Sequence, residues 1–329
     1  MTTDTPNSPL ARTQVRELSA QDLNLFVPEN ATYIANDATE HLEDLVLQDN
    51  DDILLTTNQL LSDFGGVIFV GPPGTSKSWY ASAIAVTLAK GKSELVRFVQ
   101  FHPSYQYEDF VEGYIPDEEN GGFVLTPKHL LQMCRVAVEH PNEMVFIVID
   151  ELSRVDPGRV FGEALTYIEK SKRGLKFRVA SGTECSIPAN LYILATMNPQ
   201  DRGVDEVDAA FERRFAKIQM DPSRILLGQF LEESGMPADL RRRVEVFFMT
   251  INGRAAQTPA AAIGHTFFRG IGDEASLQAL WDHQLRFLLK KAYVIDPHGY
   301  ADAEKSWNQI VPSKSPSDSA DTTTASPED

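Results

Sequence analysis

The segment that most constrains the fold of this chain covers residues 67–78. Four apolar residues, VIFV, run directly into the loop GPPGTSKS, and a helix-forming stretch follows at residues 78–90. A strand that passes through a glycine-rich loop into a helix is the setting of a phosphate-binding loop, because backbone N–H groups and the positive end of the helix surround the phosphates. The segment therefore predicts an α/β fold that holds a nucleotide at this loop.

The residue types in the loop divide the binding of a nucleotide among them. Lys77 is suited to neutralise charge on the β- and γ-phosphates, and the Ser78 hydroxyl is placed to ligate Mg²⁺. No lysine or arginine occurs from Glu17 to Ser76, which favours a specific role for Lys77. The predicted nucleotide-binding residues of the loop are Gly71, Pro72, Pro73, Gly74, Thr75, Ser76, Lys77 and Ser78.

Ser76 occupies the loop position at which the general pattern has a glycine. A side chain at that position crowds the approach of the phosphates. We therefore expect Ser76 to affect the affinity for a nucleotide rather than the identity of the site. The alternative interpretation of the whole loop is a chance turn rich in glycine and proline.

A second apolar run, MVFIVI at residues 144–149, ends in two carboxylates, Asp150 and Glu151. Ligands of open α/β sheets bind at the carboxyl ends of the strands, so this pair is expected beside the phosphates. Asp150 is predicted to hold Mg²⁺ and Glu151 to polarise the attacking water, a division that hydrolysis requires. A solvated turn after a core strand is the alternative interpretation.

A third run, residues 191–196, ends in Met197 and Asn198. The neutral amide of Asn198 can hydrogen-bond the γ-phosphate or the attacking water from the tip of its strand. The sequence therefore predicts a site assembled from three strand ends.

The alternation of apolar runs and helical segments predicts a five-stranded parallel sheet with flanking helices. Two helices are expected to open at Thr126-Pro127 and at Asp156-Pro157, each a capping residue followed by proline. The five predicted strands are residues 67–70, 95–101, 144–149, 191–196 and 216–220.

Beyond Pro222 the strand signal stops, and helices are expected at residues 225–233, 239–251 and 274–293. These helices predict a small, all-helical C-terminal lid domain. The expected organisation is a disordered tail at residues 1–25, a large α/β nucleotide-binding domain at 26–222, the lid domain at 223–310 and a second disordered tail at 311–329.

The formal net charge of −17 argues against a broad nucleic-acid-binding surface, because phosphate contacts dominate such binding. We expect any contact with DNA to be indirect or confined to the pore of an assembly. No apolar stretch is long enough for a membrane span and no secretory signal is evident, so a cytoplasmic location is expected. The two cysteines, Cys134 and Cys185, suggest neither a disulfide framework nor a zinc site.

Four segments together resemble the McrB group, within the dynein-related branch of the AAA+ nucleoside triphosphatases. The resemblance extends over roughly residues 35–295. The segments are FHPSYQYEDFVEGYIP at residues 101–116, DELSRVDPGRVFGEALTYIE at 150–169, MNPQDRGVDEVDAAFERRF at 197–215 and IGHTFF at 263–268. The resemblance implies a ring-forming motor, expected to be a hexamer, that hydrolyses ATP or GTP with Mg²⁺ and drives a separate McrC-like nuclease subunit in restriction or antiphage defence.

The same resemblance implies roles for particular residues. Asn198 takes the sensor-1 position, and Asp201 and Arg202, which complete the MNxxDR element, are expected to bind the nucleotide. Arg213 and Arg214 take the place of an arginine finger that reaches the nucleotide of a neighbouring subunit, although they could instead stabilise the end of a helix. The DNA-reading domain of that group is not expected in the short segment before the motor, and no nuclease site is evident, so target recognition and cleavage are expected from another chain.

Two other functions are compatible with the motifs. The loop GPPGTSKS also resembles that of MoxR-like chaperone ATPases, which remodel proteins, but the segment YEDFVEGY and the MNxxDR element favour McrB. A nucleotide-binding scaffold without turnover is the second alternative, and the presence of Glu151 and Asn198 argues against it.

Two surface features remain open to interpretation. A basic group at residues 170–178 is expected to form a hairpin that either lines a pore or is simply solvated; its members are Lys170, Lys172, Arg173, Lys176 and Arg178. The aromatic residues Tyr105, Tyr107, Phe110 and Tyr114 are expected to pack rather than to bind a partner.

Overall fold

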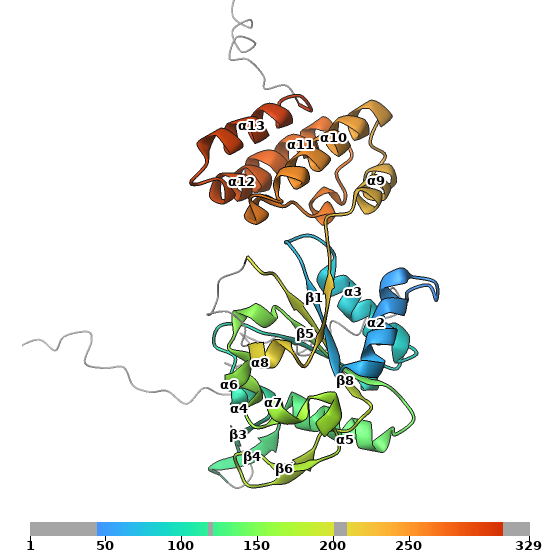
Figure 1. Ribbon diagram of the computed structural model, residues 1–329, viewed down its shortest axis with the longest axis vertical. Coiled ribbons are helices and arrows are strands. Elements are labelled where there is room, and N and C mark those ends of the chain that lie inside the picture. Colours follow the sequence, from blue (N-terminus) through green and yellow to red (C-terminus); the bar gives the residue numbers. More distant parts are fainter. Residues whose placement is uncertain (1–44, 118–120, 201–208, 312–329) are drawn as a thin grey trace, which may run out of the picture. The chain divides into compact units, whose positions relative to one another are not determined.

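The computed structural model describes residues 45–117, 121–200 and 209–311. Within them, five parallel strands form one sheet in the order β2-β5-β8-β1-β9 (Figure 1). The strands are β1 (Gly66–Val70), β2 (Val96–Gln100), β5 (Val145–Asp150), β8 (Leu191–Met197) and β9 (Ala216–Gln219). All five predicted strands are present within one or two residues of their expected bounds, and the predicted fold class is confirmed.

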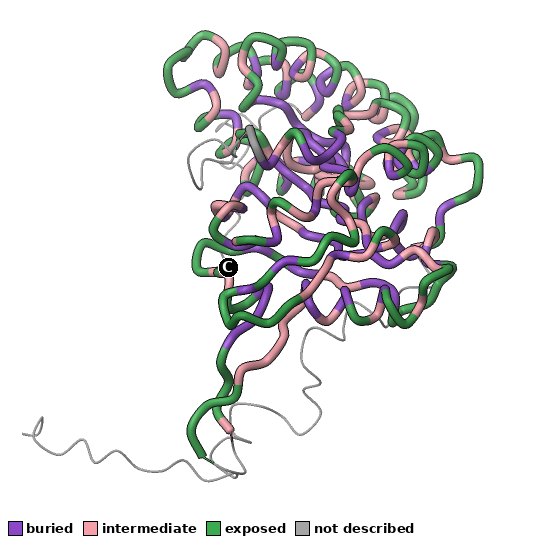
Figure 2. The backbone as a smooth tube through the Cα atoms, turned by 60° about the horizontal axis from the view of Figure 1, so that its bottom comes forward, coloured by how far each residue is buried: buried purple, intermediate pink, exposed green. Residues whose placement is uncertain are grey.

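The three central strands read as continuous apolar runs because both of their faces are covered. Every residue of β1 is buried, as are the first five of β5. Helix α3 (Lys77–Leu88) packs against β1, β2, β5 and β8, and α5 (His129–Glu139) packs against β5 and β8. Figure 2 shows the buried residues concentrated inside the molecule and the exposed ones on the outer turns.

Shorter elements surround this core. Helix α2 (Asp52–Asp63) begins at Asp51, whose carboxylate accepts hydrogen bonds from the N–H groups of Ile53 and Leu54 at 2.9 Å, and it packs against β1. The remaining short helices of this region are α4 (Tyr107–Phe110), α6 (Pro157–Phe161), α7 (Ala164–Tyr167) and α8 (Ala209–Glu212). The predicted helix start at Asp156-Pro157 is confirmed, since Asp156 caps α6 by accepting from the Gly158 N–H.

Two antiparallel hairpins extend from the α/β region: β3 (Glu112–Pro116) with β4 (Phe123–Pro127), and β6 (Lys176–Arg178) with β7 (Glu184–Ser186). The first hairpin corrects the expectation that Thr126-Pro127 opens a helix. Pairing with Gly113 and Glu112 keeps these two residues extended, and the helix begins only at His129. Long-range strand pairing here overrides the local capping signal. The second hairpin was predicted and is confirmed.

Within the described residues 224–307, the C-terminal region contains helices and turns but no strand. Its helices, which we call the lid helices, are α9 (Arg224–Glu233), α10 (Ala238–Arg254), α11 (Glu274–Leu280), α12 (Arg286–Ala292) and α13 (Pro297–Trp307). The span predicted as one helix at residues 274–293 is α11 and α12 joined by a single π-helical turn, Trp281–Leu285. Helix α13 was not predicted; it is anchored by Trp307, which stacks on Trp281 at 4.9 Å in a second hydrophobic core.

Both predicted tails, apart from Val311, lie outside the described residues. None of the helices that the structure does describe combines the length and apolar character needed to span a membrane. Both cysteines are free thiols, Cys134 buried and Cys185 half-buried.

Candidate functional site

The loop between β1 and α3 forms one wall of a cavity of about 300 Å³. Gly74 and Ser76 both have positive φ angles, 77° and 64°, which curl the backbone into a compact turn before the helix. The first turn of a helix leaves its N–H groups without intrahelical acceptors, so this turn is suited to hold an anion. The cavity is lined by Pro73, Gly74, Thr75, Ser76, Lys77, Ser78, Trp79, Glu151, Thr196, Asn198 and Thr266.

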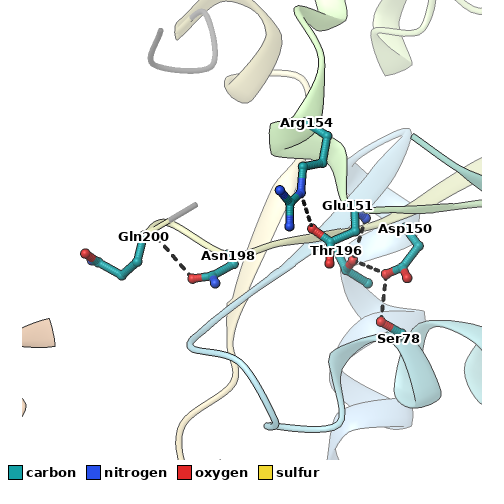
Figure 3. A network of polar contacts seen from close by, with 7 residues as sticks. All are labelled: Ser78, Asp150, Glu151, Arg154, Thr196, Asn198 and Gln200. Carbon is teal, nitrogen blue, oxygen red and sulfur yellow. Dashed lines mark hydrogen bonds and ion pairs between the residues drawn. The ribbon is translucent and has the colours of Figure 1, made fainter. Parts of the chain in front are cut away.

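The two carboxylates lie where the sequence placed them, at the carboxyl end of β5 (Figure 3). The Ser78 hydroxyl donates to Asp150 Oδ1 at 2.7 Å, which joins the start of α3 to the end of β5. The Thr196 hydroxyl donates to the same oxygen of Asp150 and accepts from the Glu151 N–H at 3.1 Å. Thr196 was missed as a site residue, because a threonine inside an apolar strand has no signal of its own.

The oxygen atoms gathered here have the chemistry that Mg²⁺ prefers. Mg²⁺ bound beside a nucleotide usually takes one or two protein oxygens together with phosphate oxygens. The Ser78 hydroxyl and the Asp150 carboxylate meet within hydrogen-bond distance beside the phosphate-binding loop. These two residues therefore fit the predicted metal role.

Glu151 and Asn198 line the same cavity from two different strand ends. Glu151 has a positive φ of 60°, and its carboxylate accepts from Arg154 Nε at 3.2 Å. Asn198 Oδ1 accepts from the Gln200 N–H at 3.1 Å, so the amide presents its NH₂ group as the donor. A carboxylate and an amide donor on one cavity wall are suited to orient a water molecule.

A segment beside the lid helices closes another side of the cavity. The Gly264 N–H donates to Pro73 O at 3.1 Å, and the Thr266 N–H donates to Gly74 O at 3.0 Å. A Cβ on Gly264 would lie 1.9 Å from Gly74 O, so only glycine permits this approach. His265 is buried beside them. The sequence singled out residues 263–268 only as part of a resemblance and did not indicate that they touch the loop.

The structure does not bring the two predicted finger arginines to this cavity. Arg213 and Arg214 line a different cavity of about 510 Å³, together with Asp63, Phe64, Glu169, Lys170, Ser171 and Lys172. Arg214 is buried, whereas Arg213 is exposed. Asp201 and Arg202 lie outside the described residues.

The basic group at residues 170–178 does not form one surface. Arg173 is half-buried and donates to the carbonyls of Ile168, Leu191 and Gly65 at 2.8, 2.8 and 3.1 Å, so its expected place in a surface hairpin is wrong. Burial lowers the pKa of Arg173 to about 10. Lys176 pairs with Glu184 at 2.7 Å on the exposed hairpin.

The aromatic segment mostly packs, as predicted. Phe110 is fully buried, and Tyr105 lies against Phe101 at 4.8 Å between ring centroids. Tyr107 is half-buried, and its hydroxyl accepts from the Ala180 N–H. Tyr114 is an exception at 70% exposed, because it lies in the outer part of β3, where Ile115 and Pro116 are exposed as well.

Comparison with known proteins identifies the family of this chain. Residues 66–215 match the family described as AAA domain (dynein-related subfamily). The Type IV methyl-directed restriction enzyme EcoKMcrB subunit of Escherichia coli (strain K12) is 31% identical over 253 residues, which cover 70% of this chain and 54% of that protein. The Type II restriction enzyme BsuMI component YdiS of Bacillus subtilis (strain 168) is 23% identical over 188 residues, 45% of this chain and 55% of that protein.

The chain thus spans about half the length of these curated relatives. Among solved structures, a protein from Cytophaga hutchinsonii described as a candidate ATPase superposes with a TM-score of 0.37 at 14% identity, over 74% of this chain and 83% of that one, and adds nothing to the assignment. Residues 66–215 are an AAA domain of the dynein-related subfamily, and the chain belongs to the McrB-like AAA+ proteins.

Proposed function

We propose that this chain hydrolyses a nucleoside triphosphate, ATP or GTP, in the cavity formed by the loop at residues 71–78. The observation that carries the proposal is the hydrogen bond between Ser78 and Asp150, with Thr196 bridging Asp150 to Glu151. Binding alone would need only the loop. A carboxylate held at a fixed place behind the metal-binding pair is what hydrolysis requires in addition.

The residues divide the reaction as follows. Lys77 and the backbone N–H groups of the loop bind the phosphates, and Gly71 to Ser76 shape the turn that presents them. Ser78 and Asp150 would hold Mg²⁺, which supplies charge neutralisation at the phosphates. Glu151 accepts hydrogen bonds from the attacking water and polarises it, while the Asn198 amide donates to the γ-phosphate or to that water.

We also propose that the chain assembles into a ring, with six copies as the expected number. Arg213 lies outside the cavity of its own chain and is exposed, as a residue that completes a neighbouring subunit's site would be. In this assembly Arg213, with Arg214 behind it, stabilises the charge that develops on the neighbour's phosphates. Asp201 and Arg202 are proposed to bind the nucleotide.

The relatives named as restriction-enzyme subunits support a role as the motor subunit that drives a separate McrC-like nuclease in restriction or antiphage defence. DNA is proposed to contact the chain only indirectly or through the pore of the ring. A MoxR-like chaperone ATPase is the alternative. Co-purification with an McrC-like nuclease would support the restriction role, whereas co-purification with a protein that the chain remodels would support the chaperone role.

Turnover of ATP and of GTP by the purified chain tests the proposed reaction. Glu151→Gln should lower turnover at least about 100-fold while leaving the Kd for nucleotide within about twofold, because only the water-polarising charge is lost. Lys77→Ala should abolish binding itself. Unchanged turnover in Glu151→Gln would remove Glu151 as the base, and binding without turnover in the wild-type chain would support a scaffold instead.

A further inference from the structure

The side chain of Ser76 makes a contact that a glycine at the same position could not make. Ser76 Oγ lies 2.9 Å from Nε2 of His265, which belongs to the segment preceding α11. The φ angle of Ser76 is 64°, in the left-handed region where glycine is favoured. Ser76 therefore has a backbone conformation that is unfavourable for a residue with a side chain. The contact with His265 is a favourable interaction that offsets this cost.

The hydrogen-bond partners of His265 define which atom donates in this pair. The Ser223 N–H donates to His265 Nδ1 at 3.2 Å, so Nδ1 carries no hydrogen. Burial of the ring lowers the pKa of His265 to about 4, and a neutral imidazole has a single N–H, here on Nε2. His265 Nε2–H thus donates to Ser76 Oγ.

The Ser76 hydroxyl hydrogen must then point away from the imidazole. Ser76 lines the cavity beside Lys77 and Ser78, where phosphate oxygens are the acceptors that a nucleotide would bring. The backbone hydrogen bonds of Gly264 and Thr266 to the loop keep this segment in place independently of the two side chains. The pair can therefore orient a donor without being needed to hold the segment against the loop.

We propose that the Ser76 hydroxyl donates a hydrogen bond to a phosphate oxygen of the bound nucleotide, and that His265 is the positioning residue that orients this hydroxyl. The inference rests on the proposed function, because it takes the cavity to be a nucleotide site. Ser76 then contributes to nucleotide binding, and the affinity for the nucleotide depends on the placement of the segment that carries His265.

The test compares Kd values for fluorescent ADP and GDP analogues with Mg²⁺, using the full chain. Ser76→Ala keeps the backbone restriction and removes only the hydroxyl, and it should weaken binding about 3- to 10-fold, the value of one hydrogen bond. His265→Ala should weaken it by a similar factor. The double variant should bind no more than about twofold more weakly than either single variant, because both remove the same interaction.

Two conservative variants separate positioning from mere structural support. Gln at position 265 can keep a donor near the place of Nε2, so His265→Gln should bind within about twofold of wild type. Asn can keep only an acceptor for the Ser223 N–H, so His265→Asn should bind as weakly as His265→Ala. The reverse order would show that His265 acts only through the Ser223 backbone and would overturn the proposal.

Nucleotide binding by Lys77→Ala and the thermal unfolding of the variants serve as the two controls. If wild type binds neither analogue, the proposed function fails and this inference fails with it. If wild type binds, Lys77→Ala does not, and Ser76→Ala matches wild type, then only the inference fails. Midpoints of thermal unfolding within a few degrees of wild type confirm that the position-265 variants remain folded.

Discussion

At the scale of single residues, one hydroxyl organises the acidic end of the site. Thr196 lies in β8, between the strands that carry the phosphate-binding loop and the carboxylates. Its Oγ1 donates to Asp150 and accepts from the Glu151 N–H, so it determines where both residues lie. The side chain is almost fully buried, at 2% exposed, so water cannot replace these bonds.

Thr196→Val removes this hydroxyl with little change of shape. We expect turnover to fall about 10-fold and the free energy of unfolding to fall by about 1–2 kcal/mol, because a buried N–H and a carboxylate each lose a partner. Thr57→Val in α2 is the matched control. Among the described residues the buried Thr57 hydroxyl has no hydrogen-bond partner, so its loss should leave stability unchanged or raise it by up to about 1 kcal/mol. Equal losses in both variants, measured by urea unfolding, would contradict the role of Thr196.

We expect His265 to account for part of the loss of stability of the protein in acid. Burial lowers its pKa from the ordinary 6.5 to about 4 in the folded chain. Between these values the imidazole of the unfolded chain binds a proton that the folded chain does not. The contribution of His265 to the free energy of unfolding is therefore fully present above pH 6.5 and is lost as the pH falls toward 4. His265→Gln should make the unfolding midpoint fall less steeply over this range, whereas His298→Gln, at an exposed position, should follow the wild-type slope.

At the scale of elements, Arg173 joins parts of the chain that are distant in sequence. Its guanidinium bonds the end of α7 at Ile168, the start of β8 at Leu191 and the residue before β1, Gly65. A planar group with several N–H donors in a fixed fork can satisfy three carbonyls at once. The start of β1 is thus tied to α7 and β8 by a side chain that the sequence grouped with a surface hairpin.

Arg173→Ala should lower the free energy of unfolding by about 3 kcal/mol or more, because several buried carbonyls lose their donor. Arg173→Lys should recover little of this loss, since an ammonium cannot reproduce the fork. Arg178→Ala, on the exposed side of the hairpin, is the control and should change stability by less than about 0.5 kcal/mol. A comparable loss in the control would show that the hairpin, and not the buried guanidinium, is what matters.

At the scale of the whole molecule, the proposed nucleotide cavity is lined by most of the predicted site residues that the structure describes, namely residues 73–78, Glu151 and Asn198, but not by the two arginines. The exposed Arg213 and the buried Arg214 share a separate cavity with Lys172 and Glu169. The hydrogen bond from Ser171 and the charges of Lys172 and Arg214 lower the pKa of Glu169. This cationic surface is the part of the molecule proposed to face a neighbouring subunit.

Mixing two inactive variants tests that arrangement. Arg213→Ala lacks the finger and Glu151→Gln lacks the base, so each alone should show almost no turnover. In rings mixed at equal amounts, about one quarter of the sites should combine an intact Glu151 with an intact Arg213 from the neighbour and regain activity. Glu151→Gln mixed with Lys77→Ala should regain none, since both act within one chain. No recovery in the first mixture would remove Arg213 as a residue acting between subunits.

The sequence by itself determined the five strands and their alternation with helices. It also determined that Ser78 lies at the start of a helix and that Asp150, Glu151 and Asn198 lie at the carboxyl ends of strands. These features follow from hydrophobic periodicity and from residues adjacent in the chain, which are local properties. Only the tertiary structure decided the roles of Thr196, Arg173 and His265, because each acts on residues brought near by folding. The tertiary structure also decided where α5 starts and that α13 forms, because strand pairing at Pro127 and burial of Trp307 outweigh the local signals.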